Sequence, residues 1–362
     1  MHSRYSEVII FRPIAIAISL ILSSCTVYDE GLWPIVEQIN IEDHPHTVFF
    51  STDIVSSLSF IKAKHFYVWA DSILVTVNNP STDKKVVVLS YLSSSEIIGE
   101  YLGYGNGPNE VLICTDHLYR DTLYINDVAK NKLYYFVLPD IVRTPHQFDS
   151  ISVFDYHGYG PTPFVTMIDK RSILCENPYH FSDRKSHIYN TAKNRFDRYC
   201  LGDERMIIHT NYKYDTYNVS QGIIVPIIEK NRVYYASSSK PLIEIYDKEG
   251  TRIKRLTGPS ELPANYSIHN GSIEFKERIP YSYLGYCLTN SFLYLNYIGG
   301  YFEDGFHNLH STIIKFDFDG NLIESFILPE YVSSFSIVDD NLIYGKGYNN
   351  QGETVLKKFF RQ

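Results

Sequence analysis

Two groups of acidic and histidine side chains are the candidates for chemistry in this sequence. Glu303, His307 and His310 lie within one polar stretch, and carboxylates together with neutral imidazoles bind metal ions. Asp116 and His117 form a second pair near the start of an apolar run. A solvated loop explains the first group equally well, and a hydrogen-bonded pair at a strand edge explains the second. We therefore predict no metal site and keep these five residues as candidates only.

The remaining motifs indicate no catalytic nucleophile. The sequence has no Gly-x-Ser-x-Gly elbow and no His-Glu-x-x-His pair. The Gly-rich run Gly103–Glu110 (GYGNGPNE) would bind a phosphate only if it opened a helix, with Lys-Ser or Lys-Thr after it. It leads instead into the apolar stretch VLICTDHLY, and similar Gly-Pro patterns recur at Gly158–Pro161 and Gly258–Leu262. We interpret the run as a structural turn between repeated units.

The first residues have the layout of a secretion signal. Arg12 precedes the short apolar core Pro13–Leu22, which runs directly into Leu-Ser-Ser-Cys25. A membrane-spanning helix needs about 20 apolar residues, which is longer than this core. The Leu-Ser-Ser-Cys end resembles the lipobox of bacterial lipoproteins, which implies cleavage before Cys25 and its acylation, including by palmitate. Several acyl chains on one residue anchor a protein stably.

This layout predicts the organisation of the chain and its location. We expect a signal peptide over residues 1–24, a tether over 25–34 and a single domain over 35–362. The protein would then be an outer-membrane lipoprotein of the cell envelope, facing the periplasm or the cell surface. The formal net charge is −8 and both signs are scattered. We therefore expect contact with the membrane through the lipid anchor only, and no binding of nucleic acid.

Cysteine usage leaves the redox state open. The four cysteines after the anchor are in apolar, strand-like surroundings, and none belongs to a Cys-x-x-Cys pair that would indicate zinc or thioredoxin chemistry. An exported protein can oxidise four cysteines in three alternative pairings. We favour buried free thiols. The residues are Cys114, Cys175, Cys200 and Cys287.

A repeated pattern of strands determines the predicted fold. A polar turn followed by a short apolar strand recurs at intervals of 49 to 60 residues, at Leu74, Leu123, Ile173, Val233, Leu293 and Leu342. Each unit has an apolar run before the turn, and further strands after it that are joined by tight turns such as DKEGT and DFDGN. These turns place Gly250 and Gly320 where a hairpin demands a positive φ. The pattern predicts an all-β, six-bladed β-propeller of four-stranded antiparallel blades, with a β-sandwich or another all-β fold as the alternative.

The last unit lacks a fourth strand. It ends near Phe360 after its third strand. We predict that the N-terminal segment 35–50 supplies the missing outermost strand, with Thr47–Phe50 as its most strand-like part. Closure of the ring by an N-terminal strand would remove an exposed sheet edge.

At this point the chain resembles the six-bladed β-propeller lipoproteins of gut anaerobes, which are related in fold to TolB-like and NHL-type propellers. The residues that carry the resemblance are Leu22–Cys25, Gly105–Glu110 and Val338–Tyr344. The resemblance covers nearly the whole mature chain. It implies a fold rather than an activity, although enzymes related in fold place calcium or catalytic acids in the central channel.

The parity of strands in a blade predicts which loops share a face. The junctions that leave the fourth strands emerge on the same face as the loops that join second and third strands, and the longest of these loops is expected over Tyr297–Ser311. Aromatic side chains in these loops are typical of a binding site beside the mouth of a channel; alternatively, they pack their own loops. The candidate ligand-binding residues are Tyr104, Tyr179, His180, Phe181, Tyr301, Phe302 and Phe306.

Two functions from different classes follow. We favour a non-catalytic binding module, active as a monomer, whose loop-rich face engages an envelope protein, a peptide or a glycan. The alternative is a metal-dependent hydrolase or lyase that uses the central channel. We expect no cofactor in the first case, and calcium is the ion considered for the second.

Overall fold

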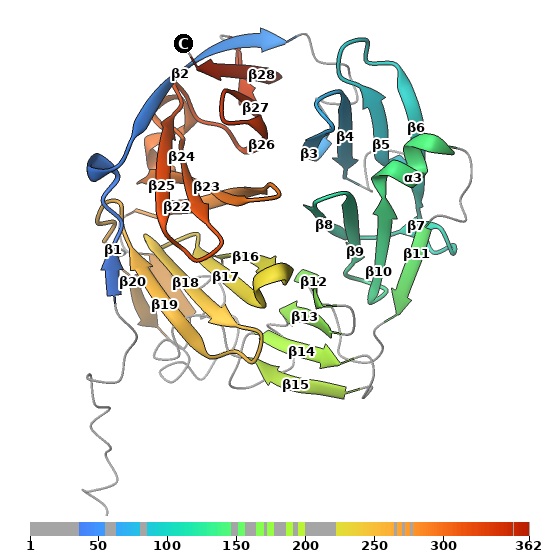
Figure 1. Cartoon of the computed structure of the whole chain (residues 1–362), viewed down its shortest axis with the longest axis horizontal. Coiled ribbons are helices and arrows are strands. Elements are labelled where there is room, and N and C mark those ends of the chain that lie inside the picture. Colours follow the sequence, from blue (N-terminus) through green and yellow to red (C-terminus); the bar gives the residue numbers. More distant parts are fainter. Residues whose placement is uncertain are drawn as a thin grey trace, which may run out of the picture.

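The computed structural model describes most of the domain predicted from the sequence (Figure 1). The described residues are 36–54, 63–79, 85–145, 151–155, 164–169, 172–176, 186–190, 195–199, 222–263, 266–269, 272–275, 278–349 and 351–361. In this part of the chain, no helix is both long enough and apolar enough to cross a membrane.

The first two sheets each contain four strands that follow one another along the chain. The first consists of β3 (Ala63–Trp69), β4 (Ile73–Asn78), β5 (Lys85–Tyr91) and β6 (Ile97–Tyr104), with the short parallel strand β7 (Glu110–Val111) at its edge. The second consists of β8 (Cys114–Tyr119), β9 (Thr122–Asp127), β10 (Lys132–Val137) and β11 (Ile151–Asp155), with the helix α3 (Leu138–Arg143) between its last two strands.

The next two sheets repeat this order. One consists of β12 (Phe164–Asp169), β13 (Ser172–Glu176), β14 (Ser186–Asn190) and β15 (Arg195–Tyr199). The other consists of β16 (Gly222–Ile227), β17 (Arg232–Ser237), β18 (Leu242–Asp247) and β19 (Arg252–Thr257), with η5 (Ile228–Lys230) after β16 and β1 (Val36–Gln38) parallel to β19. A separate hairpin follows, formed by β20 (Tyr266–His269) and β21 (Ser272–Phe275).

The last two units are joined into one eight-stranded sheet. The first of them contains β22 (Pro280–Leu288), β23 (Phe292–Tyr301), β24 (Thr312–Asp317) and β25 (Leu322–Ile327), with η6 (Phe302–Asp304) and η7 (Phe306–Asn308) after β23. The second contains β26 (Ser334–Asp339), β27 (Leu342–Tyr348) and β28 (Thr354–Arg361). The strand β2 (His46–Ile54), which follows η2 (Ile41–Asp43), lies between β25 and β28.

The predicted repeat coincides with the second strand of each four-stranded unit. The six repeat positions fall in β4, β9, β13, β17, β23 and β27. The two predicted hairpin glycines, Gly250 and Gly320, have φ values of 88° and 81°. In the first of these turns the Asp247 carboxylate accepts hydrogen bonds from the backbone N–H groups of Glu249 and Thr251 at 3.0 and 2.7 Å. Local turn chemistry therefore sets the hairpins, and the all-β prediction is confirmed.

The strand β2 differs from a simple edge strand of one unit. Its first residues pair in parallel with β25 over His46–Val48, and its remaining residues pair antiparallel with β28 over Phe49–Ile54. Nine extended residues are long enough to reach both units. Phe49 points inward and packs against Phe326, with ring centroids 5.3 Å apart. The strand β2 therefore joins the last two units into one eight-stranded sheet, whereas the sequence predicted four strands in each blade.

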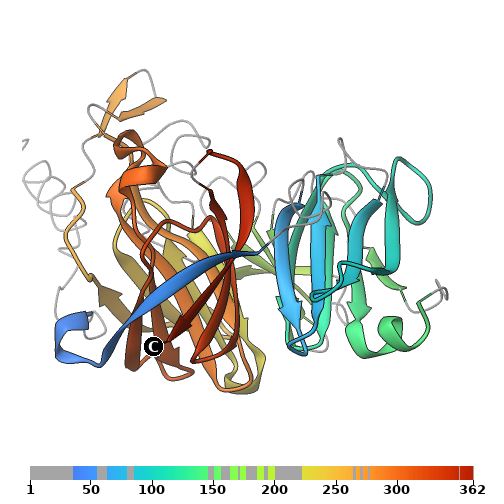
Figure 2. The same ribbon diagram turned by 90° about the horizontal axis from the view of Figure 1, so that it is seen from above.

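The units surround a common axis, and the arrangement is a β-propeller. Contacts between first strands connect β12 to β16, β16 to β22, β22 to β26 and β26 to β3. In Figure 1, β3, β8, β16 and β26 lie around the centre of the ring, and the later strands lie outside them. Figure 2 shows α3 (green) on one face, whereas η6 (orange) and the β20–β21 hairpin lie on the opposite face. This opposite face is the predicted loop-rich face.

Candidate functional site

A cavity of about 240 Å³ lies at the centre of the ring, and we call it the upper cavity. Its walls come from the first strands β3, β8, β16, β22 and β26. Most of the lining residues lie at or just before the beginnings of these strands, which is the end at which the loop-rich face lies. Tyr67 and Tyr286 line both this cavity and a second one of about 260 Å³ toward the opposite face. Their rings therefore separate the upper cavity from the rest of the channel.

The upper cavity contains a hydrogen-bonded group of three side chains. His65 and Tyr67 point to the same side of β3 because they are two residues apart in a strand. The Nδ1 atom of His65 is 2.9 Å from one carboxylate oxygen of Asp116 on β8, and the hydroxyl of Tyr67 donates to the other oxygen at 2.9 Å. The Asp116 side chain is 0% exposed, whereas the His65 side chain is 41% exposed. The histidine therefore lies between the enclosed carboxylate and solvent.

Electrostatics keep the enclosed carboxylate ionised. Burial on its own raises the pKa of Asp116, but the His65 ring, the nearby Lys64 and the Tyr67 hydroxyl outweigh burial and lower the pKa below its ordinary value. Burial and the negative charge of Asp116 together raise the pKa of Tyr67 well above its usual range. At neutral pH the group thus consists of a carboxylate that accepts hydrogen bonds from a phenol and from an imidazole.

Asp116 and His117 do not act as a pair, although they are adjacent in sequence. Successive side chains of a strand point to opposite sides, so His117 packs away from the Asp116 carboxylate. Its ring is 4% exposed and stacks on Tyr124, with ring centroids 4.7 Å apart. Burial lowers the pKa of His117 to about 4. Asp116 therefore lines the upper cavity, whereas His117 belongs to the packing of its own sheet.

A cluster of aromatic side chains lies on the loop-rich face, over β22, β23 and β27. Its members are Tyr281, Phe302, Phe306, Tyr331 and Tyr348, which we call the upper aromatic cluster. Phe306 stacks on Tyr331 at 4.9 Å and on Tyr348 at 6.3 Å between centroids. Phe302 contacts Phe306 and Tyr281 edge to face, at 6.2 and 5.6 Å. The predicted loop aromatics therefore pack together, and Phe302, at 49% exposed, presents the most surface.

The loop that carries these aromatics is shorter than the sequence suggested. Residues 297–301 continue β23 because β22 begins at Pro280 and pairs with Tyr301. Tyr301 lies beneath the guanidinium of Arg278, 4.0 Å from its ring centroid, and its backbone N–H donates to the carboxylate of Asp304 at 3.0 Å. The prediction of a long irregular loop from residue 297 is therefore wrong: two 3-10 turns, not a long irregular segment, connect β23 to the residues before β24.

The acidic and histidine residues of this loop point to separate partners. The Glu303 carboxylate accepts a hydrogen bond from the backbone N–H of Ile279 at 3.0 Å. The Nδ1 atom of His310 lies 3.0 Å from the carbonyl oxygen of Pro329, and the His307 ring lies beside the ring of Tyr348. Among the residues that the structure describes, no three His, Cys, Asp or Glu side chains are close enough together to hold a metal ion. The five candidates from the sequence therefore do not converge on one centre.

Of the remaining predicted site residues, Tyr104 is the one in the described part of the chain, and it does not line the upper cavity. Tyr104 is 52% exposed and ends β6, an outer strand on the other side of the ring from β23 (Figure 1). Tyr179, His180, Phe181 and the lipidation site Cys25 lie outside the described residues. Cys114 and Cys287 are free thiols, which agrees with the preferred interpretation of these two cysteines. The side chains of the other two cysteines lie outside the described part.

The Gly-rich run is a turn that encloses its own acidic side chain. It leads from β6 to β7, and Gly105 has a φ of 146°. The Glu110 carboxylate folds back and accepts a hydrogen bond from the backbone N–H of Gly107 at 2.6 Å. A Cβ atom on Gly103, Gly105 or Gly107 would meet this side chain. The interpretation as a structural junction is confirmed, and the N–H group that a phosphate would use is taken by Glu110.

The pairing of His65 with Asp116 is the part of the site that the sequence did not reveal. The two residues are 51 positions apart and come from different sheets. The available signal was the alternation in AKHFYVW, which places His65 and Tyr67 on one side of a first strand. That alternation predicts a shared side, but the partner on the neighbouring first strand depends on how the units are arranged around the axis.

Comparisons with known proteins identify the fold without identifying an activity. No protein-family model and no curated protein matches the chain. The chain is similar to a Bacteroides fragilis NCTC 9343 protein described as exported, with 11% identity over 91% of this chain and 100% of that one and a TM-score of 0.53. It is also similar to a member of the DUF4221 family from Bacteroides vulgatus ATCC 8482, with 8% identity over 87% and 96% of the two chains and a TM-score of 0.54. At this identity the likeness shows that the fold is shared.

Proposed function

We propose that the protein is a cell-envelope lipoprotein whose domain is a six-bladed propeller closed by β2. Six groups of strands around one axis support the blade number, and the pairing of β2 with β28 supports the closure. The lipobox-like residues before Cys25 support the anchor. The similarity to a Bacteroides fragilis protein described as exported agrees with this location. We propose that the anchored molecule acts as a monomer.

We further propose that it is a non-catalytic binding module that engages its ligand or partner on the loop-rich face. The observation that carries the proposal is the position of the upper aromatic cluster beside the upper cavity. Leu284 packs against the cluster and also lines the cavity, so the two features form one continuous surface. A concave, largely apolar site with a few polar groups is the usual form of a binding site. Exposed aromatic rings at its edge supply rigid contact area.

Capture from a cell-envelope extract tests this proposal. We expect the immobilised full-length protein to retain an envelope protein, peptide or glycan, and the double variant Phe302→Ala/Phe306→Ala to retain at least tenfold less of it. Phe50→Ala is the matched control, because Phe50 lies on β2 at the rim of the ring and is 45% exposed, close to the 49% of Phe302. Equal retention by the double variant and wild type would place the binding surface elsewhere.

Metal analysis of the same protein separates this function from the hydrolase alternative. The binding module requires no bound ion for retention of its partner, so treatment with a chelator should leave capture unchanged. Stoichiometric calcium or zinc that disappears in an Asp116→Asn variant would instead favour metal-dependent chemistry in the channel.

A further inference from the structure

The polar groups that face the upper cavity are mainly hydrogen-bond donors. Lys64 lines the cavity, and its ammonium group donates one hydrogen bond to the backbone carbonyl of Cys114 at 3.1 Å. Two of its N–H groups remain as donors. In the described part of the chain, Nδ1 is the nitrogen of His65 that has a partner, so Nε2 remains for a ligand, and it donates to that ligand in the imidazolium form. Ser334 also lines the cavity, and its buried hydroxyl has no partner among the described residues.

The carboxylate of the cavity is not available to a ligand in the same way. Asp116 has a fully enclosed side chain, and each of its oxygens already accepts a hydrogen bond. Its negative charge lies directly beside the His65 ring. Asp116 is therefore a positioning residue, because it orients the imidazole through Nδ1 and supplies the counter-charge. The groups that a ligand would touch carry positive charge or donate hydrogen bonds.

The other walls of the cavity are apolar. Phe66, Ile223, Ile224, Leu284 and Phe335 are among the lining residues, together with the rings that form its floor. Typical ligand pockets measure roughly 300–1,000 Å³, so a cavity of about 240 Å³ fits a compact molecule. Apolar walls and donor groups together match a ligand that has an apolar body and one anionic group.

We propose that the upper cavity binds a small organic acid, with the ligand's anionic group at Lys64, His65 and Ser334 and its apolar body against the surrounding rings. The proposal deepens the binding function proposed above and rests on it. It names the chemical class of one ligand, and it assigns His65 as a binding residue and Asp116 as the residue that positions it.

Three probes of the same shape and different charge test the ligand class. The probes are indole-3-acetate, indole-3-acetamide and tryptamine, added at millimolar concentration to the full-length protein and followed by calorimetric titration. We expect the anion to bind about tenfold more tightly than the neutral amide, because a charge-assisted hydrogen bond in a partly buried site exceeds a neutral one by about that factor. We expect the cation to bind most weakly.

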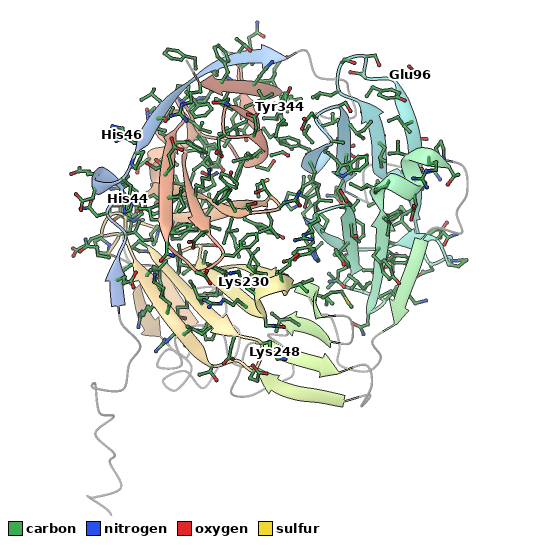
Figure 3. The ribbon with its side chains drawn as sticks, in the orientation of Figure 1. His44, His46, Glu96, Lys230, Lys248 and Tyr344 are labelled. Carbon is green, nitrogen blue, oxygen red and sulfur yellow. The ribbon has the colours of Figure 1, made fainter. Side chains whose placement is uncertain are left out.

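Variants assign the charge preference to the histidine. His65→Gln keeps a polar side chain of similar reach without the positive charge, and we expect it to remove the preference for the acid over the amide. Asp116→Asn should also weaken binding of the acid, because it removes the carboxylate that orients the His65 ring through Nδ1. His46→Gln is the control, since His46 lies at the outer rim of the ring (Figure 3).

The ratio of acid binding to amide binding in Asp116→Asn is a readout that a purely structural role would not change. A loss of packing would weaken binding of indole-3-acetate and of indole-3-acetamide alike. Loss of the Asp116 carboxylate, which orients the imidazole through Nδ1, should weaken binding of the acid more than binding of the amide.

Three results would overturn the proposal. They are equal or tighter binding of the amide or of the amine, an unchanged preference in His65→Gln, and no heat of binding for any probe. With any of these results, the broader binding function is still supported if capture of an envelope partner depends on Phe302 and Phe306. Loss of that dependence with intact binding of the acid would refute the aromatic surface instead.

Discussion

The substitution His117→Phe should change how the stability of the protein depends on pH in the acid range. The imidazole is buried against Tyr124, and burial lowers the pKa of His117 from 6.5 to about 4, although the Asp116 charge acts in the opposite direction. In the unfolded chain the same imidazole is in water and has its ordinary pKa. The folded and unfolded states therefore take up this proton at different pH values.

The sign of the effect follows from the state that binds the proton first. As the pH falls below 6.5, His117 is protonated in the unfolded chain and stays neutral in the folded protein until about pH 4. The free energy of unfolding therefore decreases over this interval. Because one pKa unit corresponds to about 1.4 kcal/mol, the decrease is at most ~3.5 kcal/mol. Phenylalanine keeps an aromatic ring against Tyr124 and has no titrating group, so this decrease should be absent.

Urea unfolding measures the difference. The free energy of unfolding of the wild type and of His117→Phe is determined at neutral pH and at about pH 4, with tryptophan fluorescence as the signal. The quantity to compare is the change with pH within each protein, because the substitution also alters packing. Asp116 contributes to the acid dependence of both proteins and cancels in this comparison. If the free energies of unfolding of the two proteins change with pH in parallel, the burial of a neutral His117 is refuted. The control variant His46→Gln should show the same pH dependence as the wild type.

Three further predictions concern the ring and its junctions. Phe49→Ala should lower the free energy of unfolding by about 3–5 kcal/mol, because the Phe49 ring is buried between β2 and its neighbours. Phe50 is exposed, so Phe50→Ala should have little effect. Equal losses for the two variants in denaturant unfolding would refute the closing role of β2. Gly105→Ala should lower the free energy of unfolding by about 1–3 kcal/mol, because alanine is strained at the positive φ of this position. Adding Glu110→Ala to that variant should restore part of the loss, because the methyl group added at position 105 would otherwise overlap the Glu110 carboxylate. Strictly additive losses in a double-mutant cycle would contradict this overlap. Tyr283→Phe should reduce the free energy of unfolding by about 1 kcal/mol, because its buried hydroxyl donates to a backbone carbonyl at 2.8 Å; an unchanged denaturation midpoint would argue against that bond.

Much of the fold could be predicted because local chemistry specifies it. Second strands such as that at Leu293 begin directly after a polar turn, and turns such as Asp247–Thr251 require a glycine at one position. Other features depend on distant partners. The helix α3 follows β10 without interruption, and its only sequence signal is a proline at the start of the helix. Gly299 and Gly300 looked like loop residues, but they remain in β23 because a long β22 pairs with this strand as far as Tyr301.

The candidate site was predictable only in part for the same reason. The aromatic residues around Phe302 were identified from loop composition, but their mutual packing depends on Tyr331 and Tyr348, which come from the next unit. The pair of His65 and Asp116 forms across two neighbouring first strands. No short-range pattern encodes such a contact, because it arises from the closure of the ring.

Hydrogen–deuterium exchange with and without the captured envelope partner tests the central claim most directly, because it locates the bound surface on the chain. We predict slower exchange in η6 and η7 and at the start of β3, where the upper aromatic cluster and the upper cavity lie. The rim strands β2 and β28 should exchange at the same rate in both states. Protection confined to β2 and β28, with none at η6, η7 or β3, would contradict the account.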